Sequence, residues 1–254
     1  MFYAKNFKGK FGIVTGAASG IGRATAIHLA QAGAGLSLVD LAGEQLSVLA
    51  SEIEKANLLS PLALTANVSS EVDVEEFAKA TLAAFGRIDF LVTSAGVLRR
   101  TAFQEILPDE WDLVLAVNLR GTYLCCKAVV PTMIKQGAGA IVNVASLAGR
   151  SVSVLGGAHY TASKHGVIGL SRHIARELGP YGIRVNAFCP GGTLTPMVQE
   201  ATPPEEMEAT AAKWPLRRWA APEEQARVIA FLLSDESSFM TGAAVDSNGG
   251  ALMV

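Results

Sequence analysis

The sequence has few cysteines, few aromatic residues and almost no net charge. Its three cysteines, Cys125, Cys126 and Cys189, are odd in number and lack metal-site spacing, which argues against a disulfide framework and a zinc centre. We therefore expect buried, reduced thiols, no metal and a cytoplasmic protein. The formal charge of -2 arises from 21 basic and 23 acidic residues, without a basic patch or an acidic tail. This balance argues against a nucleic-acid partner.

Long apolar runs are also missing. No uninterrupted run approaches the roughly 18 residues that a membrane span needs. The segment Met1 to Lys10 carries three lysines and no apolar core, so it does not have the pattern of a secretory signal. We expect a protein with no membrane partner.

What is present is a regular alternation of β-rich and helical segments. With 254 residues, half of them hydrophobic, the chain can bury one sizeable core. The alternation predicts an α/β fold: one domain over 1–254, with a doubly wound parallel sheet of about seven strands. The expected strands are 11–15, 35–39, 62–66, 88–93, 140–144, 183–188 and 243–245. The expected helices are 23–32, 42–55, 71–85, 108–136, 160–178 and 222–234, and the proline-rich stretch at about 192–215 is predicted to be a mobile substrate lid.

A glycine-rich turn follows the first strand. It reads Gly16-Ala17-Ala18-Ser19-Gly20-Ile21-Gly22 and leads into a helix of small residues. Backbone N–H groups at a helix N-terminus favour a pyrophosphate, and glycines let the backbone approach it. The spacing is G-x-x-x-G-x-G rather than G-x-G-x-x-G, and a glycine turn alone is also compatible with no ligand.

The second strand ends in an acidic residue, Asp40, at about the distance from the glycine turn where a dinucleotide site places one for the adenosine ribose. The alternative is that Asp40 only caps the helix that follows. We favour the ribose role, and hence NAD as the cofactor. Asp40 would repel the 2′-phosphate of NADP, Leu41 offers no counter-charge, and Arg23 is expected to face solvent or a neighbour.

Tyr160 and Lys164 stand at i and i+4, which places both side chains on one face of a helix. A free tyrosine has a pKa of about 10, whereas an efficient general acid or base titrates near the working pH. A lysine charge about 4 Å away could supply the required shift only in a partly desolvated cleft. The pair is therefore a candidate acid–base unit, although the same spacing is common in ordinary helices.

Taken together, these segments resemble the short-chain dehydrogenase/reductase family. The resemblance covers about Lys8 to Gly250 and rests on Thr15-Gly16-x-x-x-Gly20-Ile21-Gly22, Asn118, Ser146, Tyr160-x-x-x-Lys164 and Pro190-Gly191. It implies a Rossmann-like domain that binds NAD(P), interconverts alcohols and carbonyls, and forms a homotetramer or homodimer through its long helices.

The resemblance also implies roles for single residues. Tyr160 would move the hydroxyl proton, Lys164 would lower the tyrosine pKa and hold the nicotinamide ribose, Ser146 would bind the reacting oxygen, and Asn118 would support a proton-relaying water chain. Thr195 would bind the nicotinamide carboxamide. The expected cofactor-binding set is Gly16, Ser19, Gly20, Ile21, Gly22, Asp40, Asn67, Val68, Ser94, Ala95, Gly96, Tyr160, Lys164, Pro190, Gly191, Thr193 and Thr195.

The chain departs from the family pattern at two strand ends. Ser94 precedes Ala95-Gly96 where the family has asparagine, and a hydroxyl cannot make an amide's paired bonds. Asn67 precedes Val68 where the family has aspartate, and it can accept from the adenine amino group without a charge.

The expected substrate is a small, uncharged alcohol or ketone, either cyclic, aliphatic or sugar-derived. An apolar pocket favours it, and the residues expected to line this pocket are Leu98, Val152, Val154, Leu155, Leu194 and Met197. The alternatives are a 3-oxoacyl thioester (acyl-carrier-protein) reductase, which would use Arg99 and Arg100 beside the cleft, and a dinucleotide sensor without turnover. His159 borders the cleft and is a weaker candidate for substrate contact.

Overall fold

The computed structural model describes residues 7–56 and 58–254, so most of the N-terminal segment considered above lies outside the described residues. Seven parallel strands form one sheet in the order β3-β2-β1-β4-β5-β6-β7. The predicted α/β fold with about seven strands is confirmed. The strands are β1 (Phe11–Thr15), β2 (Gly35–Asp40), β3 (Leu62–Thr65), β4 (Phe90–Thr93), β5 (Gly139–Val144), β6 (Ile183–Pro190) and β7 (Ala244–Ser247).

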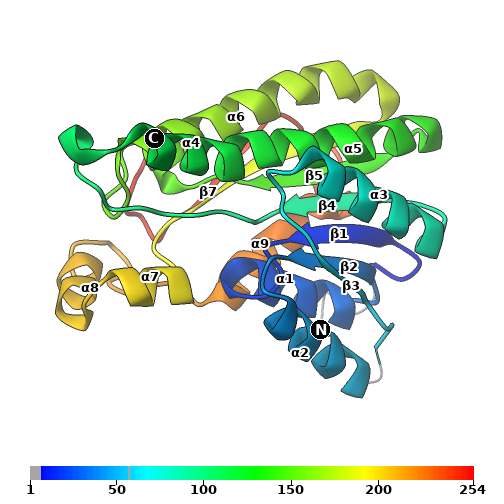
Figure 1. The fold of residues 1–254 in the computed structure, drawn as a ribbon, viewed down its shortest axis with the longest axis horizontal. Coiled ribbons are helices and arrows are strands. Elements are labelled where there is room, and N and C mark those ends of the chain that lie inside the picture. The colour runs from blue at the N-terminus through cyan, green and yellow to red at the C-terminus, as the bar shows by residue number, and fades with distance from the viewer. Residues whose placement is uncertain (1–6, 57) are drawn as a thin grey trace.

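Helices cover both faces of this sheet (Figure 1). One face carries α1 (Gly20–Gln31), α2 (Gly43–Lys55) and α9 (Pro222–Leu233), and the other carries α3 (Glu71–Phe85), α4 (Pro108–Leu115), α5 (Gly121–Gln136) and α6 (Ala158–Leu178). Alternate residues of a strand point to opposite faces, so Val14 belongs to the first core and Ile13 to the second. Burial on both faces explains why the strands are continuously apolar.

The first and last long helices pack on each other. Ala26 and Leu29 of α1 share a buried cluster with Ile229 and Leu233 of α9, and the two helices lie next to each other in Figure 1. The N-terminal glycine turn is therefore supported by residues from the far end of the chain.

The predicted helix 108–136 is continuous but contains a π-helical turn, Ala116–Arg120, between α4 and α5. By length and composition alone the stretch could cross a membrane, with a mean hydropathy of 1.5 in its most apolar part, of which 44% is buried. The expectation of no membrane-length apolar segment considered uninterrupted runs and overlooked this helix, in which polar residues separate the apolar ones. Its buried residues cover the sheet.

The predicted lid contains two short helices, α7 (Pro196–Ala201) and α8 (Pro204–Ala211), which lie beyond the carboxyl ends of the strands (Figure 1). Short 3-10 turns occur at Phe103–Glu105, Leu147–Gly149, Gly179–Tyr181 and Asp235–Ser237. Other predicted bounds differ from the structure by a few residues at element ends. The largest shift is in α1, which begins within the glycine turn because Gly20 and Gly22 themselves join the helix.

The sheet order reverses between β1 and β4, because the chain runs outward from β1 to β3 and then returns to the other side of β1. Ligands of open α/β sheets bind at such a switch point, outside the carboxyl ends of the strands. We therefore expect a ligand site among the residues that follow β1, β2, β4, β5 and β6.

Candidate active site

The glycine turn after β1 is fixed by close contacts. A Cβ on Gly22 would lie 2.1 Å from the Gly16 carbonyl oxygen, and one on Gly16 would lie 2.7 Å from the Ala95 nitrogen. Gly16 and Gly20 also have φ of +67° and +53°, values that L side chains rarely adopt. Ser19 is the N-cap of α1 but makes no side-chain capping bond, so the first amides of the helix stay available to an anion.

The Asp40 carboxylate lies beside this turn. Its two oxygens accept hydrogen bonds of 3.0 Å from the backbone N–H groups of Ala18, in the turn, and Ala42, at the N-cap of α2. Asp40 therefore does bond the start of the next helix, as the capping interpretation proposed. It also lines the cavity described below, as the ribose interpretation requires.

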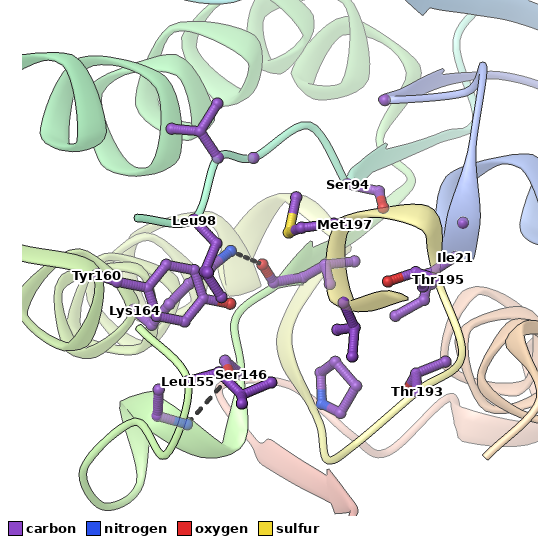
Figure 2. A pocket seen from close by; sticks show the side chains of 18 of the residues that line it. Ile21, Ser94, Leu98, Ser146, Leu155, Tyr160, Lys164, Thr193, Thr195 and Met197 are labelled. Carbon is purple, nitrogen blue, oxygen red and sulfur yellow. Dashed lines mark hydrogen bonds between the residues drawn. The ribbon is translucent and has the colours of Figure 1, made fainter. Parts of the chain in front are cut away.

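The two departures at the strand ends have different structural consequences. The Asn67 side-chain oxygen accepts from the Ser69 N–H at 3.0 Å and the Ser69 hydroxyl at 2.8 Å, so the atom expected to accept from adenine already has two partners. The Ser94 N–H donates to the Thr15 carbonyl at 3.2 Å, and its hydroxyl faces the cavity (Figure 2).

A cavity of about 470 Å³ extends from Asp40 to Tyr160. Nearly all the predicted cofactor-binding residues line it: Gly16, Ser19, Gly20, Ile21, Asp40, Asn67, Val68, Ser94, Ala95, Gly96, Tyr160, Lys164, Pro190, Gly191, Thr193 and Thr195, together with Ser146. Gly22 and Asn118 are not among the lining residues; Gly22 instead packs under the turn. Asp40 and Lys164 carry the charges of this lining, one toward each end.

Tyr160 and Ser146 meet at the far end of the cavity (Figure 2). Tyr160 lies in the first turn of α6, and Ser146 follows β5, where its Oγ accepts a 3.1 Å bond from the Ala148 N–H. Burial raises the pKa of Tyr160, and a hydrogen bond from Ser146 opposes that rise. The phenol is therefore protonated at neutral pH.

Lys164 is buried on the same face of α6. Its Nζ donates a 2.9 Å bond to the Val144 carbonyl and lies 5.8 Å from the centre of the Tyr160 ring. Burial lowers the pKa of Lys164 to about 8. The expectation that Lys164 depresses the tyrosine pKa is wrong for this structure, because burial penalises both charged forms and the ammonium bonds a carbonyl.

Asn118 is buried in the π-helical turn, away from the cavity. Its side-chain N–H groups donate to the Val97 carbonyl at 3.0 Å and to Ser163 Oγ at 3.1 Å, and its oxygen accepts from the Val97 N–H at 2.8 Å. The side chain thus joins α6 to the loop after β4. Its observed role is to hold the cavity wall at Val97, and π turns often occur at such functional positions.

The loop after β6 carries Thr193 and Thr195 to the cavity (Figure 2). Thr193 Oγ1 donates to the Gly191 carbonyl at 3.1 Å and accepts from Gln225 at 3.2 Å. Gln225, on α9, was not predicted. Its side chain also donates to the Ser247 carbonyl at 3.3 Å, and only a polar residue at a buried position of a helix could have indicated it.

The substrate end of the cavity is apolar. Leu98, Val152, Val154, Leu155 and Met197 line it as predicted, whereas Leu194 is exposed and is not among the lining residues. Trp214 was not predicted; it lines the cavity and packs edge-on against Trp219, with ring centroids 4.9 Å apart.

The two arginines after β4 already have partners within the protein and do not form an open anion-binding site. Arg100 forms an ion pair of 2.7 Å with Glu206 of α8 and donates to the Ala201 carbonyl of α7, so its charge is matched by the lid. Arg99 donates to the Leu98 carbonyl at 2.9 Å. His159 is fully buried and absent from the lining, which corrects the suggestion that it contacts substrate.

The cysteines are all buried and free, as predicted. Burial raises the pKa of Cys126 to about 12 and, as the largest effect, that of Cys189 to about 11, so neither is a nucleophile at neutral pH. Within residues 7–56 and 58–254 no cluster of three His, Cys, Asp or Glu side chains could hold a metal ion.

Known proteins resemble this chain in sequence and in fold. A family model described as enoyl-(acyl carrier protein) reductase matches residues 16–251. The 3-oxoacyl-[acyl-carrier-protein] reductase of Thermotoga maritima is 41% identical over 97% of this chain and 99% of its own length. Levodione reductase of Leifsonia aquatica is 41% identical over 94% and 92%. A solved 3-oxoacyl-[acyl-carrier protein] reductase from Brucella melitensis with bound NAD has a TM-score of 0.92 and 34% identity, covering 99% of this chain and 94% of that one.

The fold and the comparisons therefore define an oxidoreductase with a nucleotide-binding cavity and a Tyr-x-x-x-Lys motif at its far end. The chain belongs to the short-chain dehydrogenase/reductase family, whose members bind a nicotinamide dinucleotide. The residues present fit that group: glycines that admit no Cβ at the helix N-terminus, a carboxylate at the end of β2, and a cavity that continues to Tyr160.

Proposed function

We propose that this protein is an NAD-dependent dehydrogenase that interconverts a secondary alcohol and a ketone in a small, mostly uncharged substrate. The observation that carries this proposal is the substrate end of the cavity, where Tyr160 and Ser146 face an otherwise apolar lining that includes Leu98, Val154 and Met197. Such a pocket favours a cyclic, aliphatic or sugar-derived molecule that presents one hydroxyl or keto group to the two hydroxyls.

The bound nicotinamide would supply or take up the hydride. In the reducing direction Tyr160, protonated at neutral pH, gives its proton to the substrate oxygen, and Ser146 hydrogen-bonds that oxygen while charge develops on it. Lys164, mostly charged below its pKa of about 8, provides a positive charge beside the developing alkoxide. In the oxidising direction the same groups work in reverse.

Asp40 supports the choice of NAD. A 2′-phosphate at this position would face a carboxylate, and the residue that follows, Leu41, is exposed and uncharged. Arg23 is already paired with Glu52, so it is not free to neutralise a phosphate. The usual solution for NADP is an arginine near the ribose.

The test is steady-state kinetics of the unmodified protein with both cofactors and a panel of cyclic, aliphatic and sugar-derived alcohols and ketones, followed by absorbance of the reduced nicotinamide. We expect a kcat/KM at least tenfold higher with NAD(H) than with NADP(H). A preference for NADP(H) would contradict the cofactor assignment. Dinucleotide binding without turnover of any substrate would favour the sensor alternative.

A second candidate is reduction of a 3-oxoacyl thioester. It is favoured by relatives such as the Thermotoga maritima reductase, which is 41% identical to this chain. The ion pair of Arg100 with Glu206 speaks against it, because a charge matched by the lid is less able to bind an anionic carrier. Adding a 3-oxoacyl thioester to the panel decides between the two candidates by kcat/KM.

We also propose a homotetramer or homodimer assembled through the long helices. A concave patch on α4, the π-helical turn, α5 and α6 is lined by Asp112, Leu115, Ala116, Leu119, Arg120, Tyr123 and Leu170, and α4 also exposes Trp111 and Leu113. A second copy would cover these apolar groups. Light scattering should give a multiple of the 26.5 kDa chain mass, and Tyr123→Glu should reduce it; a monomeric unmodified protein would contradict this assembly.

A further inference from the structure

His159 bonds both its ring nitrogens inside the protein. Its side chain is fully buried, Nδ1 accepts from the Tyr160 backbone N–H at 2.9 Å, and Nε2 lies 2.8 Å from a carboxylate oxygen of Glu110. Because Nδ1 is an acceptor, the ring proton must be on Nε2, which then donates to Glu110. The contacts thus select one neutral tautomer.

The bond to Tyr160 replaces a missing helix cap. The first amides of a helix have no intrahelical acceptor. At the start of α6 the N-cap is Gly157, which has no side chain to supply one, and the structure shows no side-chain bond from it. The imidazole of His159 accepts from one of these amides, and that amide belongs to the residue that carries the reactive hydroxyl.

The other side of the imidazole connects to the substrate wall. Glu110 is on α4 and also accepts a hydrogen bond from the Thr101 side chain, one of the contacts that lower the pKa of Glu110. In the same loop the Arg99 carbonyl accepts from the Gly157 N–H at 2.8 Å. This loop carries Leu98, which lines the same end of the cavity as Tyr160 (Figure 2).

We propose that His159 is a positioning residue: its Nδ1 holds the Tyr160 backbone, and Glu110 orients the ring toward the loop that carries Leu98. The inference rests on the proposed function, in which Tyr160 transfers the proton. Neither side chain touches the substrate. They act through Tyr160, whose hydroxyl must reach the substrate oxygen, and a displacement of about 1 Å at a reacting group can cost about 100-fold in rate.

Two substitutions of His159 distinguish the roles of its two ring nitrogens. In His159→Asn the amide oxygen stands near the position of Nδ1 and can still accept from Tyr160, whereas in His159→Gln the amide reaches toward Nε2 and Glu110. We expect His159→Gln to lower kcat about 10- to 100-fold with the cofactor KM changed less than about threefold. His159→Asn should stay within about fivefold of the unmodified kcat. His173→Gln, on the exposed side of α6, is the matched control and should change neither.

A purely structural histidine gives a different pattern. Both substitutions would then lower the melting temperature alike, with equal kcat per folded molecule, and the inference would be wrong. An equal loss of kcat in both variants would also contradict the inference.

The hydrogen bonds can also be measured without turnover. The ¹⁵N shifts of His159 should show a protonated Nε2 and an unprotonated Nδ1, and the Tyr160 amide should exchange slowly in the unmodified protein and in His159→Asn but faster in His159→Gln. A protonated Nδ1 would overturn the inference and leave the proposed function standing. The expected shifts and exchange, in a protein that turns over no alcohol or ketone, would overturn both the proposed function and the positioning role.

Discussion

The two ends of the cavity differ in the atoms that line them, which are mainly backbone at one end and side chain at the other. At the adenosine end, backbone atoms and glycines make the contacts: the Gly22 Cα lies against the Gly16 carbonyl, and Asp40 is held by two backbone N–H groups. At the substrate end, side chains form the wall, and Val152 and Val154 are 72% and 67% exposed. The first end has little room for another side chain, whereas the second can exchange its side chains at little structural cost.

This difference explains why the cofactor end is easier to predict from the sequence than the substrate end. Relatives that are each 41% identical to this chain carry different substrates in their names, levodione and a 3-oxoacyl thioester. Such variation is expected where specificity lies in replaceable surface side chains on loops around a fixed scaffold. Substitutions at each end should therefore affect different steps of the reaction.

The largest effect is expected at Tyr160, where a substitution should affect turnover and leave cofactor binding almost unchanged. Tyr160→Phe removes the hydroxyl that transfers the proton, and proton transfer typically contributes about 10²- to 10⁴-fold to the rate. We expect kcat to fall by that range while the dissociation constant of NADH, from fluorescence titration, changes less than about threefold. A variant that retains more than about a tenth of the unmodified kcat would show that another group moves the proton.

Asp40 tests the opposite end. The double substitution Asp40→Ala with Leu41→Arg removes the carboxylate and adds a cation where a 2′-phosphate would lie, so the ratio of kcat/KM for NADP to that for NAD should rise about 10- to 100-fold. The order of preference among alcohols should stay the same, because neither residue reaches the substrate end. Leu41→Ala serves as the control. An unchanged ratio of kcat/KM for the two cofactors in the double variant would contradict the assignment of Asp40 as the residue that selects NAD.

Lys164 lies between the two ends, and its buried charge affects stability. Its pKa is about 8 in the folded protein, compared with about 10.4 when unfolded. Between these values the unfolded chain binds more protons at this lysine, so the contribution of Lys164 to the free energy of unfolding should rise with pH from about 8 to about 10. The cost of the charge at pH 7 is at most about 3 kcal/mol.

The buried cysteines, whose pKa values are raised, lower the stability over the same range, so the lysine is isolated by comparing the unmodified protein with Lys164→Met. In denaturant titrations from pH 7 to 10, the free energy of unfolding of the unmodified protein should rise relative to that of Lys164→Met, although the bond to the Val144 carbonyl that the variant loses offsets part of its gain at pH 7. A difference between the two proteins that stays flat between pH 8 and 10 would mean that the lysine is not strained by burial.

The smallest effect is expected at the lid. Arg100 and Glu206 form an ion pair on a partly exposed surface, and such pairs contribute about 0 to 1 kcal/mol. Arg100→Ala should therefore change the KM of an uncharged ketone less than about threefold, and Lys79→Ala, which breaks the exposed pair with Glu75, should match it in melting temperature. A KM for a 3-oxoacyl thioester that rises more than tenfold would instead assign Arg100 to that substrate.

Local patterns predicted most of the fold and the cofactor end. Strand periodicity, the glycine turn and the spacing of Tyr160 and Lys164 need only neighbouring residues to be interpreted. Contacts between distant residues were not accessible: Glu110 with His159, and Thr193 with Gln225, are brought together only by the packing of helices. The direction of the Tyr160 pKa was also wrong, because it depends on burial, which spacing does not reveal.

The packing of α1 against α9 has a consequence for synthesis of the chain. The glycine turn belongs to the first tenth of the sequence, yet the helix that supports α1 ends at Leu233. A nascent chain folds from its N-terminus as it leaves the ribosome. The dinucleotide site therefore matures only after nearly the whole protein has been made, and chains that stop before α9 should leave the ribosome unable to retain the cofactor.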